Sequence, residues 1–374
     1  MHEVLIVGAG KIGSVAATLL AETGDYAVTA VDCQAAALAR LPAAVRRLCV
    51  DIGDPAALAA AFAGRFAVLS AAPYQHTVAV ARAAAAAGAH YLDLTEDVAS
   101  TRAVMRLAKD ARTALIPQCG LAPGFVSIVA AHLAGDFESL HDVRLRVGAL
   151  PRYPSNALNY NLTWSTDGVI NEYCEPCEAI VDGELRQTKP LEECETFALD
   201  GVAYEAFNTS GGLGTLASSL EGRVRNLNYR TIRYPGHAAI MKALLNDLRL
   251  RERRDLLKEI LENAVPTTLQ DVVVIFVTVS GQRGGALVQE TYANRIYAGE
   301  VGGAPASAIQ ITTASSLCAV LDLLAEGRLP SVGLVRQESI RLEDFLANRF
   351  GRVYATADTA AASAAARAAL ASAA

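Results

Sequence analysis

Three glycines near the N-terminus have the spacing of a phosphate-binding turn. They fall in Gly8-Ala9-Gly10-Lys11-Ile12-Gly13, a G-x-G-x-x-G pattern that follows an apolar, β-branched run at residues 3–7. Gly8 would permit a tight turn, Gly10 would let the backbone approach a pyrophosphate, and Gly13 would let a helix pack on a strand. The free amides that open the helix would bind the phosphates. We expect a dinucleotide to contact Gly8, Gly10, Lys11, Ile12 and Gly13.

An acidic residue at the end of the next strand predicts which dinucleotide binds. Asp32 follows a second apolar run at residues 26–31 and stands 19 residues after Gly13. A carboxylate there would accept hydrogen bonds from the ribose hydroxyls and repel a 2′-phosphate, so we predict NAD rather than NADP. The alternative is a glycine turn that binds no cofactor. Strand, turn, helix, strand and acid in register favour the cofactor.

Strand and helix patterns alternate along the first 125 residues. Short apolar runs typical of buried parallel strands recur, with helix-like segments between them. Such repeats predict an α/β fold with a Rossmann-type, doubly wound parallel sheet. Further strands are expected at residues 47–50, 66–71, 90–94 and 114–117, and helices at residues 55–62, 77–87 and 99–112.

Ligands of such sheets bind beyond the carboxyl ends of the strands, which selects further candidates. Residues expected at the cofactor are Asp51, Ala72, Pro73, Gly120 and Pro123. Tyr74 is expected at the substrate. Asp93 and His76 are candidates for the base that accepts a proton from a reacting group. Asp93 could instead order its loop or cap a helix, and His76 could simply hydrogen-bond within its own loop.

The pattern changes from about residue 141. Val143, Leu145 and Val147 alternate with Arg144 and Arg146, which predicts a half-exposed antiparallel strand. Further strands are expected at residues 179–181, 229–233, 272–280 and 291–297, with 272–279 central, and helices at residues 166–173 and 238–246.

These elements predict a two-domain chain. Residues 1–125 would bind the dinucleotide, and residues 126–305 would form an α+β domain on a mixed sheet for substrate and subunit contacts. The apolar helix at residues 306–325 is expected to pack back on the first domain. The alanine-rich residues 355–374 are expected to form a frayed tail.

Composition excludes several classes of function. The chain of 374 residues has 33 basic and 39 acidic side chains, and this net charge of −6 argues against a nucleic-acid surface or a polybasic membrane anchor. No uninterrupted apolar run reaches the roughly 18 residues of a membrane span. The chain enters its first strand after Met1-His2-Glu3, so we expect no signal peptide.

The cysteines indicate a cytoplasmic protein with reduced thiols. Seven of them are scattered along the chain, an odd number that does not suggest a disulfide framework. Cys174 and Cys177 have the spacing of a redox or zinc pair, but no second pair accompanies them. We therefore expect no metal site.

Several stretches resemble the saccharopine dehydrogenase family, and their order and spacing cover most of residues 1–350. They are the loop Gly120-Leu121-Ala122-Pro123-Gly124 and residues 144–151, 164–168, 205–212 and 231–237. The Ala-Pro-Gly, Ala-Phe-Asn-Thr-Ser-Gly-Gly and Thr-Ile-Arg-Tyr-Pro-Gly-His stretches look most similar to the L-lysine 6-dehydrogenase branch. Saccharopine reductases of the family usually carry Asp where Ala122 stands.

The resemblance implies substrate-binding residues in the second domain. Arg233 lies in the last of these stretches, and its guanidinium group matches an amino-acid carboxylate with two parallel hydrogen bonds. Thr209 and Ser210, followed by two glycines, offer hydroxyl and backbone donors, and His237 would orient the segment of Arg233. The alternatives are that Arg233 is a surface arginine on an edge strand, that Thr209 and Ser210 belong to a plain turn, and that His237 has no role in the chemistry.

The expected activity is NAD-dependent oxidation of the CH–NH bond of an amino acid. L-lysine is the leading substrate, oxidised at its ε-carbon to a semialdehyde or cyclic imine. One alternative is saccharopine dehydrogenase or a related reductive condensing enzyme, which would need more cleft arginines than Arg233; Arg144, Arg146 and Arg152 are available. The other is a dinucleotide sensor without turnover. The resemblance also implies a homodimer or a higher homo-oligomer.

Overall fold

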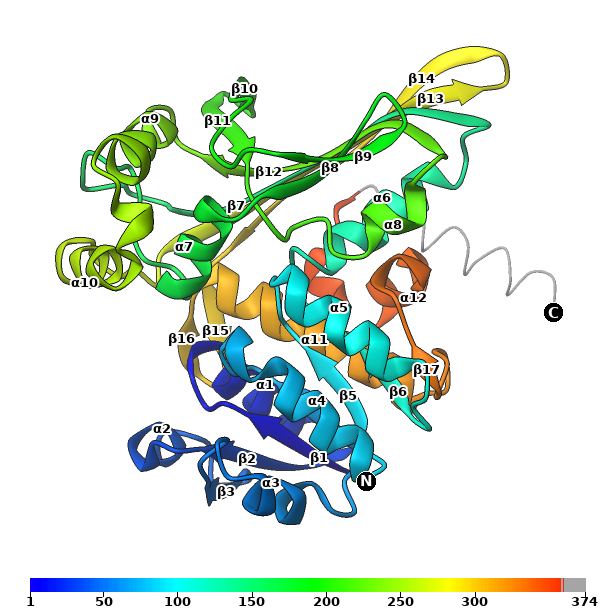
Figure 1. Ribbon diagram of the computed structural model, residues 1–374. Coiled ribbons are helices and arrows are strands. Elements are labelled where there is room, and N and C mark those ends of the chain that lie inside the picture. The colour runs from blue at the N-terminus through cyan, green and yellow to red at the C-terminus, as the bar shows by residue number, and fades with distance from the viewer. Residues whose placement is uncertain (358, 360–374) are drawn as a thin grey trace.

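Two β-sheets and a long helix, α11 (Ala308–Ala325), organise the molecule (Figure 1). The computed structural model describes residues 1–357 and 359. The parallel sheet lies at the bottom of Figure 1 and the mixed sheet at the top, with α11 between them. The tail predicted at residues 355–374 lies mostly outside the described residues.

The N-terminal sheet has seven parallel strands in the order β17-β6-β5-β4-β1-β2-β3. This confirms the predicted α/β fold with a parallel sheet. The strand order reverses between β1 and β4, the position at which such folds bind ligands. The strands are β1 (His2–Val7), β2 (Tyr26–Asp32), β3 (Arg46–Cys49), β4 (Ala67–Ser70), β5 (His90–Asp93), β6 (Ala114–Ile116) and β17 (Gly333–Leu334).

Helices cover both faces of this sheet. Successive side chains of β1 from Val4 to Val7 are apolar and point in opposite directions, so both faces must be buried. Val4 and Ile6 join the core beneath α1 and α11, whereas Leu5 and Val7 join the core beneath α3, α4 and α5. Asp54 accepts hydrogen bonds from two backbone amides of α3, a cap that stabilises a helix by about 1 kcal/mol. These helices are α1 (Lys11–Glu22), α2 (Ala35–Ala39), α3 (Pro55–Phe62), α4 (Thr77–Ala86) and α5 (Val98–Ala108).

The second sheet is mixed, as predicted, and has the main order β10-β11-β12-β7-β13-β14. β12 pairs in parallel with β7, and the other pairs are antiparallel. β13 has a partner on each side and forms a long hairpin with β14. Its strands are β7 (Ser139–Pro151), β8 (Cys177–Val181), β9 (Glu184–Thr188), β10 (Glu195–Leu199), β11 (Val202–Asn208), β12 (Val224–Arg233), β13 (Asp271–Arg283) and β14 (Ala286–Tyr297).

The prediction for β7 was wrong in two respects. The strand is mostly buried rather than half exposed, and it pairs in parallel with β12 as well as antiparallel with β13. Its arginines do alternate with apolar residues, but Arg146 is buried because its guanidinium group pairs with Glu195 of β10. This pair lies on the side of the sheet opposite the helices.

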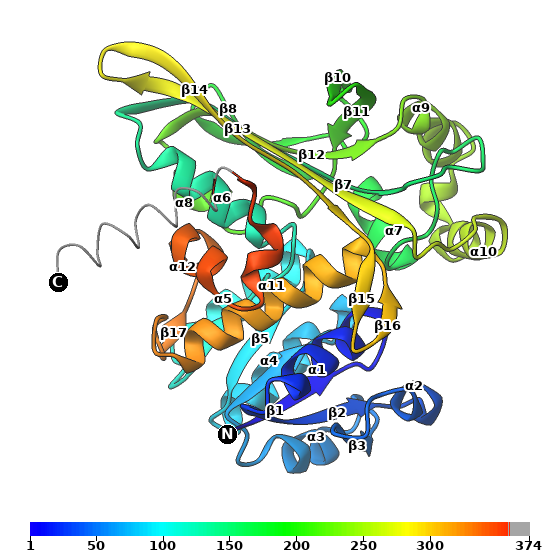
Figure 2. The same ribbon diagram turned by 180° about the vertical axis from the view of Figure 1, so that it is seen from behind.

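Helices pack on one side of the mixed sheet and at one end of it (Figures 1 and 2). α6 and α8 share a core with the inward side chains of β7, β12 and β13, and α7, α9 and α10 form a smaller core at the end of the sheet. The helices are α6 (Phe125–Ala134), α7 (Thr166–Cys174), α8 (Leu216–Leu220), α9 (His237–Lys242) and α10 (Arg254–Ala264), with the short turns η2 (Ala243–Asp247) and η3 (Leu250–Glu252).

α11 packs back on the dinucleotide domain, against α1 (Figure 2). The Gln310 side chain donates a hydrogen bond to the Lys11 carbonyl at 3.1 Å, and the Asp271 carboxylate, at the start of β13, accepts from the first amides of α11. By length and composition α11 could span a membrane, but 72% of it is buried in the protein core. The remaining elements are β15 (Gly299–Val301), β16 (Ala304–Ala306), α12 (Leu342–Ala347), η1 (Tyr74–His76), η4 (Gln337–Ser339) and η5 (Gly351–Tyr354).

Candidate active site

The glycine-rich turn between β1 and α1 has the geometry of a phosphate-binding loop. Gly8 has a φ of +97°, and a Cβ there would lie 2.8 Å from the Ala71 carbonyl oxygen. A Cβ on Gly13 would lie 1.8 Å from the Gly8 carbonyl oxygen, whereas one on Gly10 would face open space. α1 starts at Lys11 without a side-chain cap, so its first amides are free to bind phosphate oxygens. The residues present fit a dinucleotide.

Acidic side chains follow β2 and β3, on one side of this turn. Asp32 is partly buried; its Oδ2 accepts a hydrogen bond from the Ala9 amide and its Oδ1 one from the Gln34 amide, both at 2.8 Å. The carboxylate is therefore held against the glycine turn, where a ribose would lie. Asp51 is exposed in the loop after β3, and its Oδ1 accepts from the Gly53 amide at 2.8 Å.

The other predicted cofactor residues follow β4 and β6. Ala72 and Pro73 come directly after β4, and Tyr74 begins the turn η1. Gly120 and Pro123 belong to the loop after β6, which is compact because the Gly120 carbonyl accepts from the Phe125 amide at 2.9 Å. Since parallel strands end at the same edge, the fold brings both loops to the edge at which the glycine turn lies.

Asp93 orders the ends of two strands. It is 1% exposed, and its Oδ1 accepts from the amides of Thr95 and Gln118 at 3.0 and 2.8 Å. Its Oδ2 has no hydrogen-bond partner among the described residues, and burial raises its pKa to about 6. His76 is partly exposed at the end of η1. The geometry thus supports the loop-ordering alternative for Asp93 and gives His76 access to solvent.

Arg233 is buried at the end of β12, a strand with neighbours on both sides. The residue is 2% exposed, so it is not the surface arginine of the alternative interpretation. Its Nε donates to the Tyr173 hydroxyl at 3.0 Å and its Nη1 to the Ile232 carbonyl at 2.9 Å, and the Tyr160 ring lies 4.8 Å from the guanidinium carbon. These contacts fix a buried cation and use two of its three nitrogens.

A chain of hydrogen bonds sets the orientation of Arg233. His237 Nδ1 lies 2.8 Å from the Leu158 carbonyl, which can only accept, so Nδ1 carries the proton. His237 Nε2 then accepts from the Tyr173 hydroxyl at 3.1 Å, and the Tyr173 oxygen accepts from Arg233. Burial, with the nearby arginine, lowers the pKa of His237 to about 3, so the ring stays neutral. His237 therefore positions Arg233 through Tyr173.

The loop that follows β11 connects the two domains. The Thr209 hydroxyl bonds to that of Thr231 at 2.7 Å, and the Ser210 hydroxyl donates to the Pro176 carbonyl at 2.9 Å. Both hydroxyls are therefore engaged inside the second domain. A Cβ on Gly211 would lie only 2.3 Å from the carbonyl oxygen of Glu96, which follows β5 of the first domain. The loop thus closes directly against the strand ends of the dinucleotide domain.

Two glutamates that the sequence analysis did not select lie on either side of this loop. Glu96 precedes α5, and Glu172 lies on α7, where its carbonyl accepts from the Ser210 amide at 3.0 Å. Burial raises the pKa of Glu96 to about 7; burial and the charge of Glu96 raise that of Glu172 to about 8, against an opposing effect of Arg233. Glu172 could have been found, because an acid three residues after Val169 shares its side of α7, where Val169 is buried.

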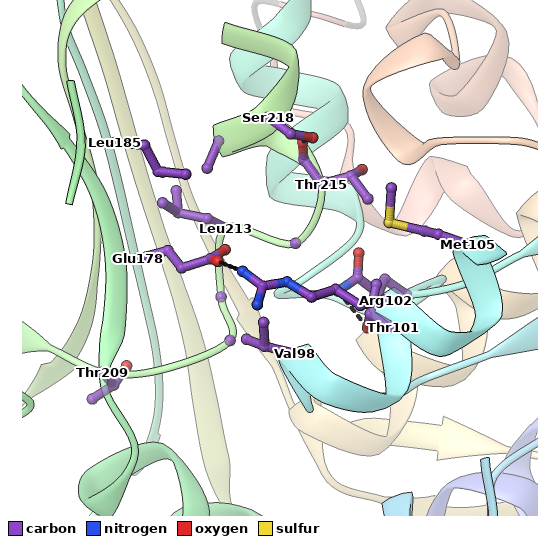
Figure 3. A pocket seen from close by; sticks show the side chains of 15 residues that line it. Val98, Thr101, Arg102, Met105, Glu178, Leu185, Thr209, Leu213, Thr215 and Ser218 are labelled. Atoms are coloured by element: carbon purple, nitrogen blue, oxygen red, sulfur yellow. Dashed lines mark hydrogen bonds and ion pairs between the residues drawn. The ribbon is translucent and has the colours of Figure 1, made fainter. Parts of the chain in front are cut away.

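A pocket of about 130 Å³ lies between α5, α8 and the hairpin β8–β9. It includes Thr209 and Gly211, and Arg102 of α5 crosses it to pair with Glu178 of β8 (Figure 3). Apolar side chains, among them Met105, Leu185 and Leu213, line the rest. This ion pair is a second direct contact between the domains beside the loop after β11.

The other candidate arginines do not join Arg233. Arg146 pairs with Glu195 and stacks on Phe276, on the opposite side of the mixed sheet. Arg144 is largely exposed beside Asp142, and Arg152 lies over exposed aromatic rings, Tyr153 among them. Of the four candidate arginines, Arg233 is therefore the one that lies near Glu172.

The cysteine pair shows no sign of metal chemistry in the described part of the chain. Burial raises the pKa of both thiols, that of Cys177 to about 12, which disfavours the thiolate form that binds metals. No group of three or more His, Cys, Asp or Glu side chains within residues 1–357 is arranged to hold a metal ion.

A parallel sheet with this glycine turn, joined to a second domain on a mixed sheet, is typical of dinucleotide-dependent oxidoreductases. Comparison with known families agrees. Residues 4–116 match the model of the saccharopine dehydrogenase NADP binding domain, and residues 120–350 match that of the saccharopine dehydrogenase C-terminal domain. The chain belongs to the saccharopine dehydrogenase family and is an NAD(P)-dependent dehydrogenase of that type.

One of three similar solved structures shares the fold. Apo saccharopine dehydrogenase (L-Glu forming) from Saccharomyces cerevisiae is similar with a TM-score of 0.76 and 18% identity, over 90% of this chain and 94% of that one. DAP dehydrogenase from C. glutamicum gives a TM-score of 0.47 and 11% identity, over 93% and 99% of the two chains. Aspartate dehydrogenase from Thermotoga maritima gives 0.40 and 12%, over 87% and 97%. At these identities the similarity concerns the fold alone, and the last two scores support no further comparison.

Proposed function

We propose that the protein oxidises the ε-amine of L-lysine with NAD. The observation that carries this proposal is the set of charges between the two domains, where Glu172 lies near the buried Arg233 on one side and near Glu96 on the other. A ligand with one carboxylate and two amino groups complements this set. Lysine is such a ligand.

The main alternative is saccharopine or a related product of reductive condensation. Such a substrate has two or three carboxylates, and each needs a cationic or amide partner when it leaves water. The candidate arginines other than Arg233 lie away from it, and Glu96 and Glu172 offer no cation to further carboxylates. The other alternative is a protein that senses dinucleotides without turnover. It assigns no role to Arg233, which a chain of hydrogen bonds holds in place.

In this proposal, the first domain binds the cofactor and the second binds the substrate carboxylate. The turn at Gly8–Gly13 and Asp32 would hold the cofactor, whose nicotinamide ring would accept the hydride. Arg233, positioned by Tyr173 and His237, would bind the substrate carboxylate. Tyr74 and the loop after β6 would lie beside the reacting carbon and exclude water. We assign Asp93 to ordering the strand ends, and keep His76 as a candidate base.

We propose NAD as the physiological cofactor, although the matching domain model is named for NADP. The Asp32 carboxylate is fixed at the turn by two amides and would repel a 2′-phosphate. Cys33 and Gln34, the next residues, bring no positive charge to this position.

The direct test is NADH absorbance with purified protein and single substrates. L-lysine with NAD should give NADH, and saccharopine with NAD should not. Turnover with saccharopine alone, or only in the reverse direction with 2-oxoglutarate and lysine, would contradict the proposal. Tight NAD binding with no turnover of any amine would favour the sensor.

We also propose a homodimer that forms through the second domain, in the cytoplasm. The outer side of the mixed sheet has a small apolar core with partly buried aromatic residues around it, including Phe197, Tyr234 and Phe276. Light scattering after size exclusion should give twice the chain mass of 39.2 kDa. A monomer at micromolar concentration would contradict the dimer.

A further inference from the structure

The two glutamates at the loop after β11 are not explained by the fold. Glu172 is 6% exposed, and its carboxyl group makes no hydrogen bond to another described residue, whereas that of Glu96 bonds to its own backbone amide. Buried carboxyl groups are normally paired, because removal of a charge from water is costly.

The backbone fixes the two glutamates on either side of the same two residues. The Ser210 amide donates to the Glu172 carbonyl at 3.0 Å, and a Cβ on Gly211 would lie 3.2 Å from the Glu96 Cβ. Glu172 comes from α7 and Glu96 from the end of β5. The pair therefore spans the cleft, with Glu172 on the substrate domain and Glu96 on the dinucleotide domain.

Their surroundings differ in a way that separates their roles. Glu172 has Arg233, Tyr160, Tyr173, Tyr229 and Cys177 within electrostatic range on its own domain, and Glu96 across the cleft. Glu96 has Asp93, Asp97 and Tyr74 around it, at the strand ends where the nicotinamide would lie. Glu172 thus stands next to the carboxylate-binding arginine, and Glu96 next to the reaction centre.

We propose that Glu172 binds the α-ammonium group of the substrate and that Glu96 accepts the proton of the amine that is oxidised. This inference rests on the proposed lysine oxidation. A carboxylate bound to Arg233 places the α-ammonium group beside Glu172, and the extended side chain then crosses the cleft towards Glu96. Glu172 is a binding residue and Glu96 is the catalytic base.

The proton and electron transfers balance with Glu96 as the base and NAD⁺ as the oxidant. The substrate arrives as R–CH2–NH3⁺, and the Glu96 carboxylate takes one proton to leave R–CH2–NH2. The C–H bond breaks as hydride passes to NAD⁺, and the nitrogen lone pair forms the C=N bond of R–CH=NH2⁺. The amine is oxidised, NAD⁺ is reduced to NADH, and water then releases ammonia and the aldehyde. The raised pKa of Glu96, about 7, suits a base near neutral pH.

Three ligands separate the two roles. L-lysine has all three groups, 6-aminohexanoate lacks the α-ammonium group, and L-norleucine lacks the ε-amine. Glu172→Gln should weaken calorimetric binding of lysine and norleucine by about tenfold or more, since a charged hydrogen bond is lost, and should leave 6-aminohexanoate unchanged. Glu96→Gln should bind norleucine normally and lose on the order of 100-fold in kcat with lysine.

The pH profile gives a readout that a merely structural residue would not change. For wild type, kcat/KM with lysine should rise with pH up to about 7, where Glu96 becomes ionised, and Glu96→Gln should lack this break. Titration of NADH fluorescence should give equal cofactor affinity for both variants. Glu343→Gln, an exposed side chain on α12, is the matched control and should behave as wild type.

The outcomes distinguish this inference from the proposed function. If wild type oxidises lysine and both glutamine variants match Glu343→Gln, the inference is wrong and the function stands; a His76→Gln variant that then loses the pH break would identify His76 as the base. If wild type binds lysine without oxidising it and Glu172→Gln abolishes that binding, the function fails and the ammonium site stands. Unchanged lysine binding in Glu172→Gln would overturn the site in either case.

Discussion

Single residues decide whether the cleft can hold an amino acid. Arg233 is useful as a buried cation because its guanidinium group is fixed by Tyr173 and the Ile232 carbonyl. His237 contributes through the Tyr173 hydroxyl and stays neutral, since burial and the charge of Arg233 lower its pKa. The proposed carboxylate site is therefore a chain of three residues rather than one.

Removal of the central hydroxyl tests this chain. Tyr173→Phe leaves the Arg233 Nε and the His237 Nε2 without their partner in a buried place, which costs about 1–3 kcal/mol. We expect KM for lysine to rise by about tenfold with a smaller change in kcat. Steady-state NADH assays measure both. An unchanged KM would show that Arg233 does not depend on Tyr173.

Asp32 tests the cofactor preference at the same scale. Asp32→Ala removes the carboxylate that would bind the ribose hydroxyls and repel a 2′-phosphate. The ratio of kcat/KM for NAD to that for NADP should fall by about tenfold or more. A wild-type enzyme that already prefers NADP would contradict our interpretation of Asp32.

At the scale of elements, the loop after β11 makes a close contact between the two domains. Gly211 has a φ of +88°, and a Cβ there would lie 2.3 Å from the Glu96 carbonyl oxygen. The glycine lets the loop after β11 close against the end of β5. The relative placement of Glu96 and Glu172 follows from this contact.

A substitution at Gly211 should therefore impair lysine oxidation without weakening cofactor binding. Gly211→Ala should retain NADH binding but lower kcat/KM for lysine by about tenfold or more, because the loop must move. Gly201→Ala is the matched control, since Gly201 has a similar φ of +78° but open space at the Cβ position. Equal activity of the two variants would show that strain alone, not the close approach, matters.

The elements that the sequence predicted are those with local patterns. The alternation of strands and helices up to residue 116, the strands β13 and β14 and the return of α11 all follow from periodicity and turn residues. β7 was misjudged because alternating arginines indicate an exposed face, whereas Glu195, far along the chain, buries Arg146 through an ion pair. No local pattern contains that partner.

The site was also predicted only in part. The glycine turn and Asp32 lie within one βαβ unit, so their spacing alone locates them. The approach of Glu96 to Glu172 depends on how two domains close around Gly211, which sequence spacing does not express. Burial of Glu172 was visible in the helix pattern of α7, but the absence of a partner was not.

At the scale of the whole molecule, a buried acid without a partner makes stability depend on pH. Burial and the charge of Glu96 raise the pKa of Glu172 from 4.5 to about 8, so the folded state favours the protonated form. The destabilising effect begins as pH rises above the unfolded value of 4.5, grows up to about 8 and is then constant.

Glu172→Gln should remove this effect. The free energy of unfolding of the variant, relative to wild type, should increase between pH 5 and pH 9 by an amount on the order of 1–3 kcal/mol. Urea denaturation without ligands at both pH values measures it, with Glu343→Gln as the control. A difference that is equal at both pH values would contradict the raised pKa.

We propose that this two-domain dehydrogenase removes the ε-amino group of lysine. L-lysine labelled with nitrogen-15 at the ε position, mixed with NAD and the enzyme, tests this directly. Labelled ammonia should be released in proportion to the NADH formed. Unlabelled ammonia, which would come from the α-amino group, or NADH formation with saccharopine and none with lysine, would contradict it.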